Sequence, residues 1–167
     1  MKKKASGKKV LKKAVAKKKP AKKKMARKQT AKQPTKKTIT DLLAAANAEV
    51  ETVSAEQALA MRGEPDVVFV DIRDIRELER EGTIPEAYHA PRGMLEFWVA
   101  PDSPYYRDIF GSGKKFLFFC AGGGRSALAA QVTQQLGLEP VCHMAGGFAA
   151  WKAAGGPVAE VTRKPAP

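Results

Sequence analysis

The stretch Lys115–Phe119 constrains the fold more than any other part of the chain, because it places four large apolar residues in succession before Cys120. A short run of aromatic and aliphatic residues bounded by turn-forming residues is typical of a β-strand that is buried on both faces. Three glycines follow at 122–124, and the apolar-periodic segment 126–136 indicates a helix that ends before Gly137. The sequence therefore predicts a buried strand, a tight glycine turn and a helix in direct succession.

The same order of strand and helix recurs along the chain after Ile39. A short Ala- and Leu-rich helix there is expected to have Thr40 or Asp41 as its N-cap. Ser54 and Gln57 form a capping box that opens the next helix. Further strands are expected at 50–53, 67–70, 88–89 and 141–144, and helices at 54–61, 74–81, 93–99 and from Gly147 through Trp151.

This alternation predicts an α/β fold with an open, mainly parallel five-stranded sheet and helices on both faces. In open α/β sheets, ligands bind at the carboxyl ends of the strands. Cys120 and the glycine loop behind it follow the end of a predicted strand. We therefore expect the functional site at this loop.

Charge is divided very unevenly along the chain. Residues 1–40 hold 17 Lys, one Arg and no acidic residue, whereas the whole chain has 30 basic and 17 acidic residues. The part from Asp41 onward therefore has 12 basic and 17 acidic residues, which is a formal charge of −5. Residues 1–38 contain no aromatic side chain and little apolar area, so we predict a disordered Lys-rich tail there and a folded domain over residues 39–167.

The composition of this tail resembles the tails of linker histones and of bacterial histone-like proteins. Dense positive charge neutralises phosphates and releases counterions, which gives sequence-independent, salt-sensitive binding to nucleic acid. The same composition also suits a tail that only keeps the protein soluble. The sequence leaves both interpretations open for residues 1–38, and it does not predict an oligomeric state.

Two cysteines, Cys120 and Cys142, do not make a disulfide framework, which favours a reducing compartment. The first 38 residues lack the apolar segment of a secretory signal, and the longest apolar stretches are too short to span a bilayer. We therefore expect a cytoplasmic protein without membrane contact, with association with the nucleoid or nucleus as an open alternative.

The segment after the central strand holds the residues of an activated thiol. A cysteine becomes a good nucleophile when a cation or a helix N-terminus lowers its pKa. Glycines 122–124 let the backbone amides curl inward as a cradle for an anion, and Arg125 adds a planar positive fork. Ser126 is expected to cap the following helix and to donate its hydroxyl. The candidate site is Cys120 with the loop Ala121, Gly122, Gly123, Gly124, Arg125 and Ser126.

Two further interpretations of this segment compete with an activated thiol. A single cysteine at the end of a strand is more often a small buried apolar residue than a nucleophile, and only its neighbours reverse that preference. The glycine-rich loop alone suggests nucleotide binding, but it lacks both the Gly-Lys-Ser/Thr ending and the Gly-x-Gly-x-x-Gly spacing that phosphate-binding loops use. The thiol interpretation is therefore preferred.

Four motifs between Val67 and Val158 resemble a single-domain rhodanese. They cover over half of the chain. In the motif that begins at Gly82, Thr83 and Glu86 stand where the family more often has His and Gly, and this difference concerns the packing of the loop. The motifs are Asp71-Ile72-Arg73 with Glu77, Gly82-Thr83-Ile84-Pro85-Glu86-Ala87, Cys120 to Ser126 as Cys-x-x-Gly-x-Arg-Ser, and Gly146-Gly147-Phe148-Ala149-Ala150-Trp151 with Gly155-Gly156-Pro157-Val158.

The resemblance implies a sulfurtransferase without a cofactor. In such an enzyme the thiolate of Cys120 takes sulfane sulfur from a donor such as thiosulfate and holds it as a persulfide. Cyanide or another thiophilic acceptor then takes the sulfur. The loop amides and Arg125 would stabilise the thiolate, the persulfide and the departing sulfite.

Three different functions compete with sulfur transfer. A cysteine phosphatase or arsenate reductase of the related cell-cycle phosphatase fold also places Cys and Arg on an anion-binding loop. Those enzymes have five residues between Cys and Arg, whereas Cys120 and Arg125 enclose four, which favours sulfur over phosphate. The second competing function is that of a non-catalytic rhodanese module used for interaction. The third is that of a polyanion-binding protein that acts through its tail.

Other chemistry-bearing residues receive structural interpretations. Cys142 lies in a predicted strand and is expected to be a buried thiol. Asp71, Arg73 and Glu77 are expected to form an ion pair that steadies the turn after the second strand. Arg92 is a candidate second anion contact. The two histidines, at 89 and 143, do not supply a metal site.

Overall fold

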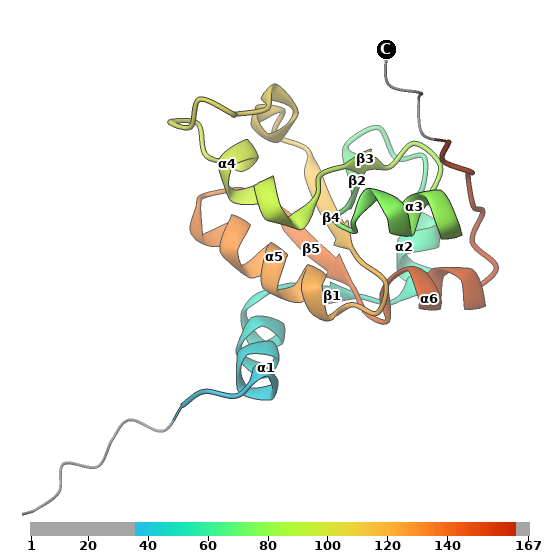
Figure 1. Cartoon of the computed structure of the whole chain (residues 1–167), viewed down its shortest axis with the longest axis horizontal. Coiled ribbons are helices and arrows are strands. Elements are labelled where there is room, and N and C mark those ends of the chain that lie inside the picture. Colours follow the sequence, from blue (N-terminus) through green and yellow to red (C-terminus); the bar gives the residue numbers. More distant parts are fainter. Residues whose placement is uncertain (1–35, 163–167) are drawn as a thin grey trace, which may run out of the picture. The chain divides into compact units, whose positions relative to one another are not determined.

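Strand β4 lies at the centre of a parallel sheet in the computed structural model, which describes residues 36–162 (Figure 1). Within these residues the strand order is β1-β5-β4-β2-β3, and every pairing between neighbouring strands is parallel. The elements are α1 Ile39–Glu49, β1 Glu51–Val53, α2 Ala55–Met61, β2 Val67–Asp71, α3 Ile75–Glu81, β3 Tyr88–His89, η1 Arg92–Met94, α4 Leu95–Val99, η2 Asp108–Gly111, β4 Lys115–Phe119, α5 Gly124–Gln135, β5 Val141–Met144 and α6 Gly147–Ala153.

The predicted fold class is confirmed, and the sheet is wholly rather than mainly parallel. The predicted strands and helices all occur, with ends that differ by a few residues. The expected disordered tail falls largely on residues 1–35, which lie outside the described residues. The proposed boundary between residues 38 and 39 stays a prediction. No helix within residues 36–162 is long and apolar enough to cross a membrane.

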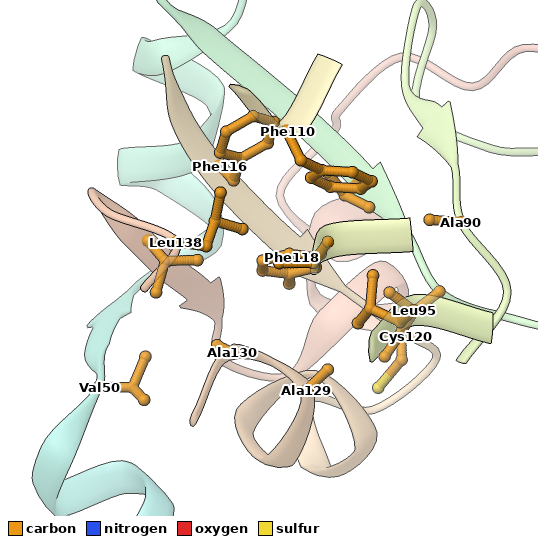
Figure 2. Packing of buried hydrophobic residues seen from close by; sticks show 14 residues of the cluster. Val50, Ala90, Leu95, Phe110, Phe116, Phe118, Cys120, Ala129, Ala130 and Leu138 are labelled. Carbon is orange, nitrogen blue, oxygen red and sulfur yellow. The ribbon is translucent and has the colours of Figure 1, made fainter. Parts of the chain in front are cut away.

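Side chains of β4 alternate between two apolar layers, as the period of a strand requires. Phe116 and Phe118 pack on the side covered by α4 and α5, and Cys120 continues this row just beyond the strand (Figure 2). Leu117 and Phe119 pack on the other side with residues of α2 and α6. Because both faces are covered, the whole run from Phe116 is buried, and the chain leaves the core only at the glycine loop.

The first helix begins earlier than its sequence predicts. Thr38 is the N-cap of α1, and neither Thr40 nor Asp41 is. The Asp41 carboxylate accepts the Thr38 backbone N–H at 2.8 Å, and the Thr38 hydroxyl accepts the Asp41 N–H at 3.2 Å. This reciprocal capping box satisfies two N–H groups of the helix end and so fixes its start. Asp41 serves as the third helical residue of the box rather than as the cap.

The turn after β2 is organised by a buried ion pair. The Arg73 guanidinium donates to the Asp71 carboxylate at 2.6 Å and to the Gly82 carbonyl at 2.8 Å, and it lies 4.1 Å from the centre of the Phe148 ring. Both charged side chains are fully buried. The Thr83 hydroxyl donates to the same carboxylate at 2.7 Å. The expected structural ion pair is therefore confirmed for Asp71 and Arg73, but Glu77 is not part of it.

Glu86 stands where its motif commonly has glycine, and the backbone conformation at this residue is one that glycine favours. Glu86 has φ +68°, in the left-handed region that favours glycine. It lies in a turn closed by a 3.1 Å hydrogen bond from the Ala87 N–H to the Ile84 carbonyl, with Pro85 as the second residue. A positive φ after proline is typical of a type II turn, in which glycine is the common third residue. Glu86 therefore occupies a glycine position.

Candidate active site

Cys120 lies directly beyond the end of β4 and is buried, with 1% of its surface exposed. Its thiol is free, and Sγ accepts the backbone N–H of Gly123 at 3.2 Å. This hydrogen bond curls the loop so that a main-chain amide points at the sulfur. A sulfur anion at this position gains the most from such a contact, because hydrogen bonds to charged acceptors are the stronger ones. Within the described residues, the Gly123 amide thus supplies a hydrogen bond to Sγ, and the role of the whole loop as an anion cradle stays a prediction.

The loop is also held from its outer side by the start of α6. The Phe148 N–H donates to the Cys120 carbonyl at 2.7 Å, and the Ala149 N–H donates to the Ala121 carbonyl at 3.0 Å. Gly147 permits this approach, because a Cβ there would lie 2.3 Å from the Cys120 carbonyl oxygen and its φ is +56°. Gly147, the first residue of α6, therefore serves the cysteine loop, a role that its place in the sequence does not predict.

Helix α5 begins at Gly124, and its N-cap is Gly123 at φ +90° rather than Ser126. The predicted capping role of Ser126 is therefore wrong, because the flexible glycines let the helix start two residues earlier. The buried Ser126 hydroxyl donates to the Gly123 carbonyl at 2.9 Å and so holds the loop closed. The N–H groups of the first turn of α5 have no partner within the helix, and they place the positive end of its dipole at the loop.

Arg125 pairs with Glu77, a residue that the sequence places in the ion pair of Asp71 and Arg73. Nη1 and Nη2 of Arg125 donate to the two carboxylate oxygens of Glu77 at 2.7 and 2.8 Å. The hydrogen bonds from Arg125 lower the pKa of Glu77 from 4.5 to about 2. The pKa of Arg125 is raised, first by Glu77 and to a smaller extent by the nearby Cys120. The bidentate ion pair therefore joins the cysteine loop to α3.

Glu77 is itself fixed by the start of α3. Asp74 is the N-cap, and its backbone N–H donates to Glu77 Oε2 at 3.1 Å in a capping box. Strand β2 precedes α3 and pairs with β4, so the segments after these two strands meet at the same edge of the sheet. The fold thereby brings Glu77 to Arg125 across 48 residues of sequence.

The Arg92 guanidinium forms an ion pair with a neighbouring side chain. It lies in η1, and its Nη1 donates to the Glu96 carboxylate at 2.5 Å. Both side chains are about one-third exposed. No contact places Arg92 at Cys120, so its role as a second anion contact stays a prediction.

Cys142 has the surroundings of a structural thiol. It lies in β5, is fully buried, and burial raises the pKa of its thiol to about 12. His143 beside it accepts or donates a 2.9 Å hydrogen bond with the Thr52 hydroxyl. Among residues 36–162, no group of three or more His, Cys, Asp or Glu side chains could hold a metal ion.

Comparison with known proteins connects this site to one family. A model of the rhodanese-like domain matches residues 54–154. The chain is 28% identical over 123 residues to an uncharacterized protein of Synechocystis sp., covering 74% of this chain and 64% of that protein. It thus spans less than two thirds of that relative. It is 26% identical over 101 residues to a rhodanese domain-containing protein of Drosophila melanogaster, covering 58% of this chain and 91% of that protein.

A solved structure from Rhodopseudomonas palustris is also similar. It is described as a protein of unknown function and possible tyrosine phosphatase, and it matches with a TM-score of 0.73 and 51% sequence identity. The match covers 77% of this chain and 99% of that one. The family match extends over more than half of the chain and includes β4, the cysteine loop and α6. The chain therefore belongs to the rhodanese-like domain family.

Proposed function

We propose that the protein is a sulfurtransferase that carries sulfane sulfur on Cys120 as a persulfide. The observation that carries this proposal is the arrangement of the loop around the sulfur. Sγ accepts the Gly123 N–H, and Arg125 follows after four intervening residues. A small cradle of this kind suits one sulfur atom and its immediate substituents.

The reaction divides into two displacements at sulfur. The Cys120 thiolate attacks the outer sulfur of a donor such as thiosulfate. A new S–S bond forms while the S–S bond of the donor breaks, and sulfite leaves with the electron pair. An acceptor such as cyanide then attacks the outer sulfur of the persulfide, and Cys120 departs as a thiolate. Neither step needs an oxidant, a reductant or a cofactor.

The residues of the loop have different roles in this reaction. The Gly123 amide and the first turn of α5 stabilise negative charge on Sγ before and after transfer. Arg125 supplies a positive charge near the sulfur. Ser126 and the N-terminal amides of α6 keep the loop in place without contacting the reacting atoms.

Phosphatase activity is the second candidate function, because the Rhodopseudomonas protein at 51% identity is described as a possible tyrosine phosphatase. Phosphoryl transfer needs a loop that surrounds three phosphate oxygens with donors. The loop of this chain has four residues between Cys120 and Arg125, and cysteine phosphatases have five. The shorter loop supports sulfur transfer over phosphate hydrolysis.

The test compares three activities in one preparation. We expect thiosulfate to add one sulfur atom to the Cys120 peptide, which mass spectrometry detects and a thiol reductant removes, and we expect thiocyanate when cyanide is added. Cys120→Ser should lose both signals, whereas Cys142→Ser, altered at the other cysteine, should keep them. Hydrolysis of an aryl phosphate without persulfide formation would favour the phosphatase. An intact protein without either activity would favour a non-catalytic interaction module.

The basic tail supports a separate proposal of nucleic-acid binding. It rests on the 17 Lys of residues 1–40 and on no structural feature. We expect the full chain to shift double-stranded DNA of any sequence in a gel and to lose affinity steeply with added salt. A protein lacking residues 1–38 should not shift DNA. Binding that persists after this deletion would show that the tail is not responsible.

A further inference from the structure

The ion pair between Arg125 and Glu77 has a consequence for the charge of the site. Both carboxylate oxygens of Glu77 are engaged by Arg125, which is 45% exposed, while Glu77 is 20% exposed. Arg125 is the one charged residue of the segment 120–126. Glu77 therefore cancels the charge of the only cation that the cysteine loop supplies.

Two further arginines of the segment that carries Glu77 are also paired. Arg73 is buried against Asp71, and Arg76 lies 3.0 Å from the Asp74 carboxylate. The domain from Asp41 onward has a formal charge of −5. The positive end of α5 remains, but it amounts to only about half a charge. A dianion approaching the Cys120 thiolate therefore meets little net positive charge on the side chains around it.

We propose that Glu77 sets the charge preference of the Cys120 site, so that organic sulfur donors carrying at most one negative charge are preferred to the thiosulfate dianion. This inference rests on the proposed sulfur transfer and names its substrate class. Organic persulfides and singly charged thiosulfonates belong to the preferred class, because each releases a thiol or a sulfinate when its outer sulfur moves to Cys120. Thiosulfate remains a substrate of lower specificity.

Glu77 offsets the positive charge of Arg125, while the guanidinium itself stays charged and keeps free N–H groups. The pair uses one N–H of each terminal nitrogen and leaves Nε–H and the outer N–H groups of Arg125. Arg125 can thus still donate to one oxygen or sulfur atom at Cys120. The preference therefore depends on the charge of the donor and not on whether the donor can reach Arg125. Removing the charge of Glu77 should change the ranking of donors by their charge.

Glu77→Gln is the decisive variant. Glutamine keeps the capping box with Asp74 and a hydrogen bond to Arg125, but it removes the negative charge. We expect kcat/KM for the thiosulfate dianion to rise about threefold relative to that for benzenethiosulfonate, which carries one negative charge fewer and releases its sulfinate when its outer sulfur moves to Cys120, because one unit of charge acts at short range in water.

Two control variants separate charge from geometry. Glu77→Asp keeps the charge at a shifted position and should retain the wild-type ranking of donors. Glu51→Gln removes a carboxylate that accepts two 2.8 Å hydrogen bonds from Lys115, at the start of β4 and away from the cysteine loop. It should leave the ranking of donors unchanged.

A second measurement does not depend on sulfur transfer. The rates at which iodoacetate and iodoacetamide alkylate Cys120 differ by one charge on the reagent, and mass spectrometry of the Cys120 peptide follows both. Glu77→Gln should raise the ratio of the iodoacetate rate to the iodoacetamide rate about threefold. The ratio should not change in Glu77→Asp or Glu51→Gln.

These results distinguish the inference from the function on which it rests. A wild-type protein that forms no persulfide with any donor would overturn sulfur transfer, and the alkylation ratio would still decide whether Glu77 sets the charge preference. Equal ratios in the wild type and Glu77→Gln would overturn the inference. A uniform loss of rate with all donors and both reagents would also overturn it, because Glu77 would then only position Arg125.

Discussion

The backbone N–H of Phe148 donates a 2.7 Å hydrogen bond to the carbonyl oxygen of Cys120. The candidate nucleophile is therefore held by two different parts of the fold. The Sγ atom of Cys120 accepts a hydrogen bond from the Gly123 amide within the loop. Its carbonyl oxygen accepts the hydrogen bond from the start of α6. Because α6 packs through Phe148 and Trp151 into the apolar layer below the sheet, the geometry of the loop depends on that layer.

Gly147→Ala should therefore disturb the loop. The new Cβ would lie 2.3 Å from the Cys120 carbonyl oxygen, at a residue with φ +56°. We expect a loss of about 2–4 kcal/mol in the free energy of unfolding, together with loss of persulfide formation on Cys120. Urea denaturation and mass spectrometry measure the two effects. Gly122→Ala is the matched control, because its Cβ would meet no atom within 4 Å. Equal effects of both variants would contradict the role given to α6.

Local sequence patterns predicted those helices and strands that depend on residues close together in the sequence. The run Phe116–Phe119 identified β4, because a strand covered on both faces needs apolar side chains on both. The capping box of Ser54 with Gln57 was identified correctly. The cap of α1 was missed, because Thr38 and Thr40 are equally good caps by residue type and only the reciprocal bond with Asp41 distinguishes them.

The candidate site also has a part that local sequence predicts and a part that depends on the arrangement of the strands. Cys120, the glycines and Arg125 are adjacent in sequence, so the loop could be predicted from spacing. The partnership of Arg125 with Glu77 could not, because it follows from the pairing of β2 with β4. The resemblance to the family named Glu77 as part of a motif, and the expectation built on it assigned Glu77 to the ion pair of Asp71 and Arg73 rather than to Arg125. The strand order was the missing information.

The turn at Glu86 offers a stabilising substitution. A side chain in the left-handed region costs about 1–2 kcal/mol, and glycine avoids this cost while losing more chain entropy on folding. Glu86 has φ +68°, so we expect Glu86→Gly to raise the free energy of unfolding by about 0.5–1 kcal/mol. Urea denaturation measures the change. Glu64→Gly, at a residue without positive φ, should not stabilise the protein. A less stable Glu86→Gly protein would contradict the strain assigned to this turn.

The buried pair of Asp71 and Arg73 should be costly to break. Arg73→Leu leaves the Asp71 carboxylate buried with the Thr83 hydroxyl and no cation. Removing one partner of a buried pair costs about 3–5 kcal/mol. The matched control is Arg76→Leu, whose guanidinium is exposed in its pair with Asp74, so that its loss of stability should be much smaller. Thermal and urea denaturation compare the two, and similar losses would show that burial of the Arg73 pair contributes nothing.

The ion pair of Glu77 with Arg125 should contribute a measurable acid sensitivity. The pKa of Glu77 is lowered in the folded protein from 4.5 to about 2. Because the folded pKa is depressed, the stabilisation is present above the unfolded pKa and is lost as the pH falls from 4.5 toward 2. Other carboxylates with lowered pKa values, such as Asp74, add a common slope. We therefore expect the wild type to lose about 1–2 kcal/mol more than Glu77→Gln over this range, after allowance for the exposure of Arg125. Urea denaturation at a series of pH values measures the difference, and parallel curves for the two proteins would mean that the Glu77 carboxylate gains nothing from Arg125.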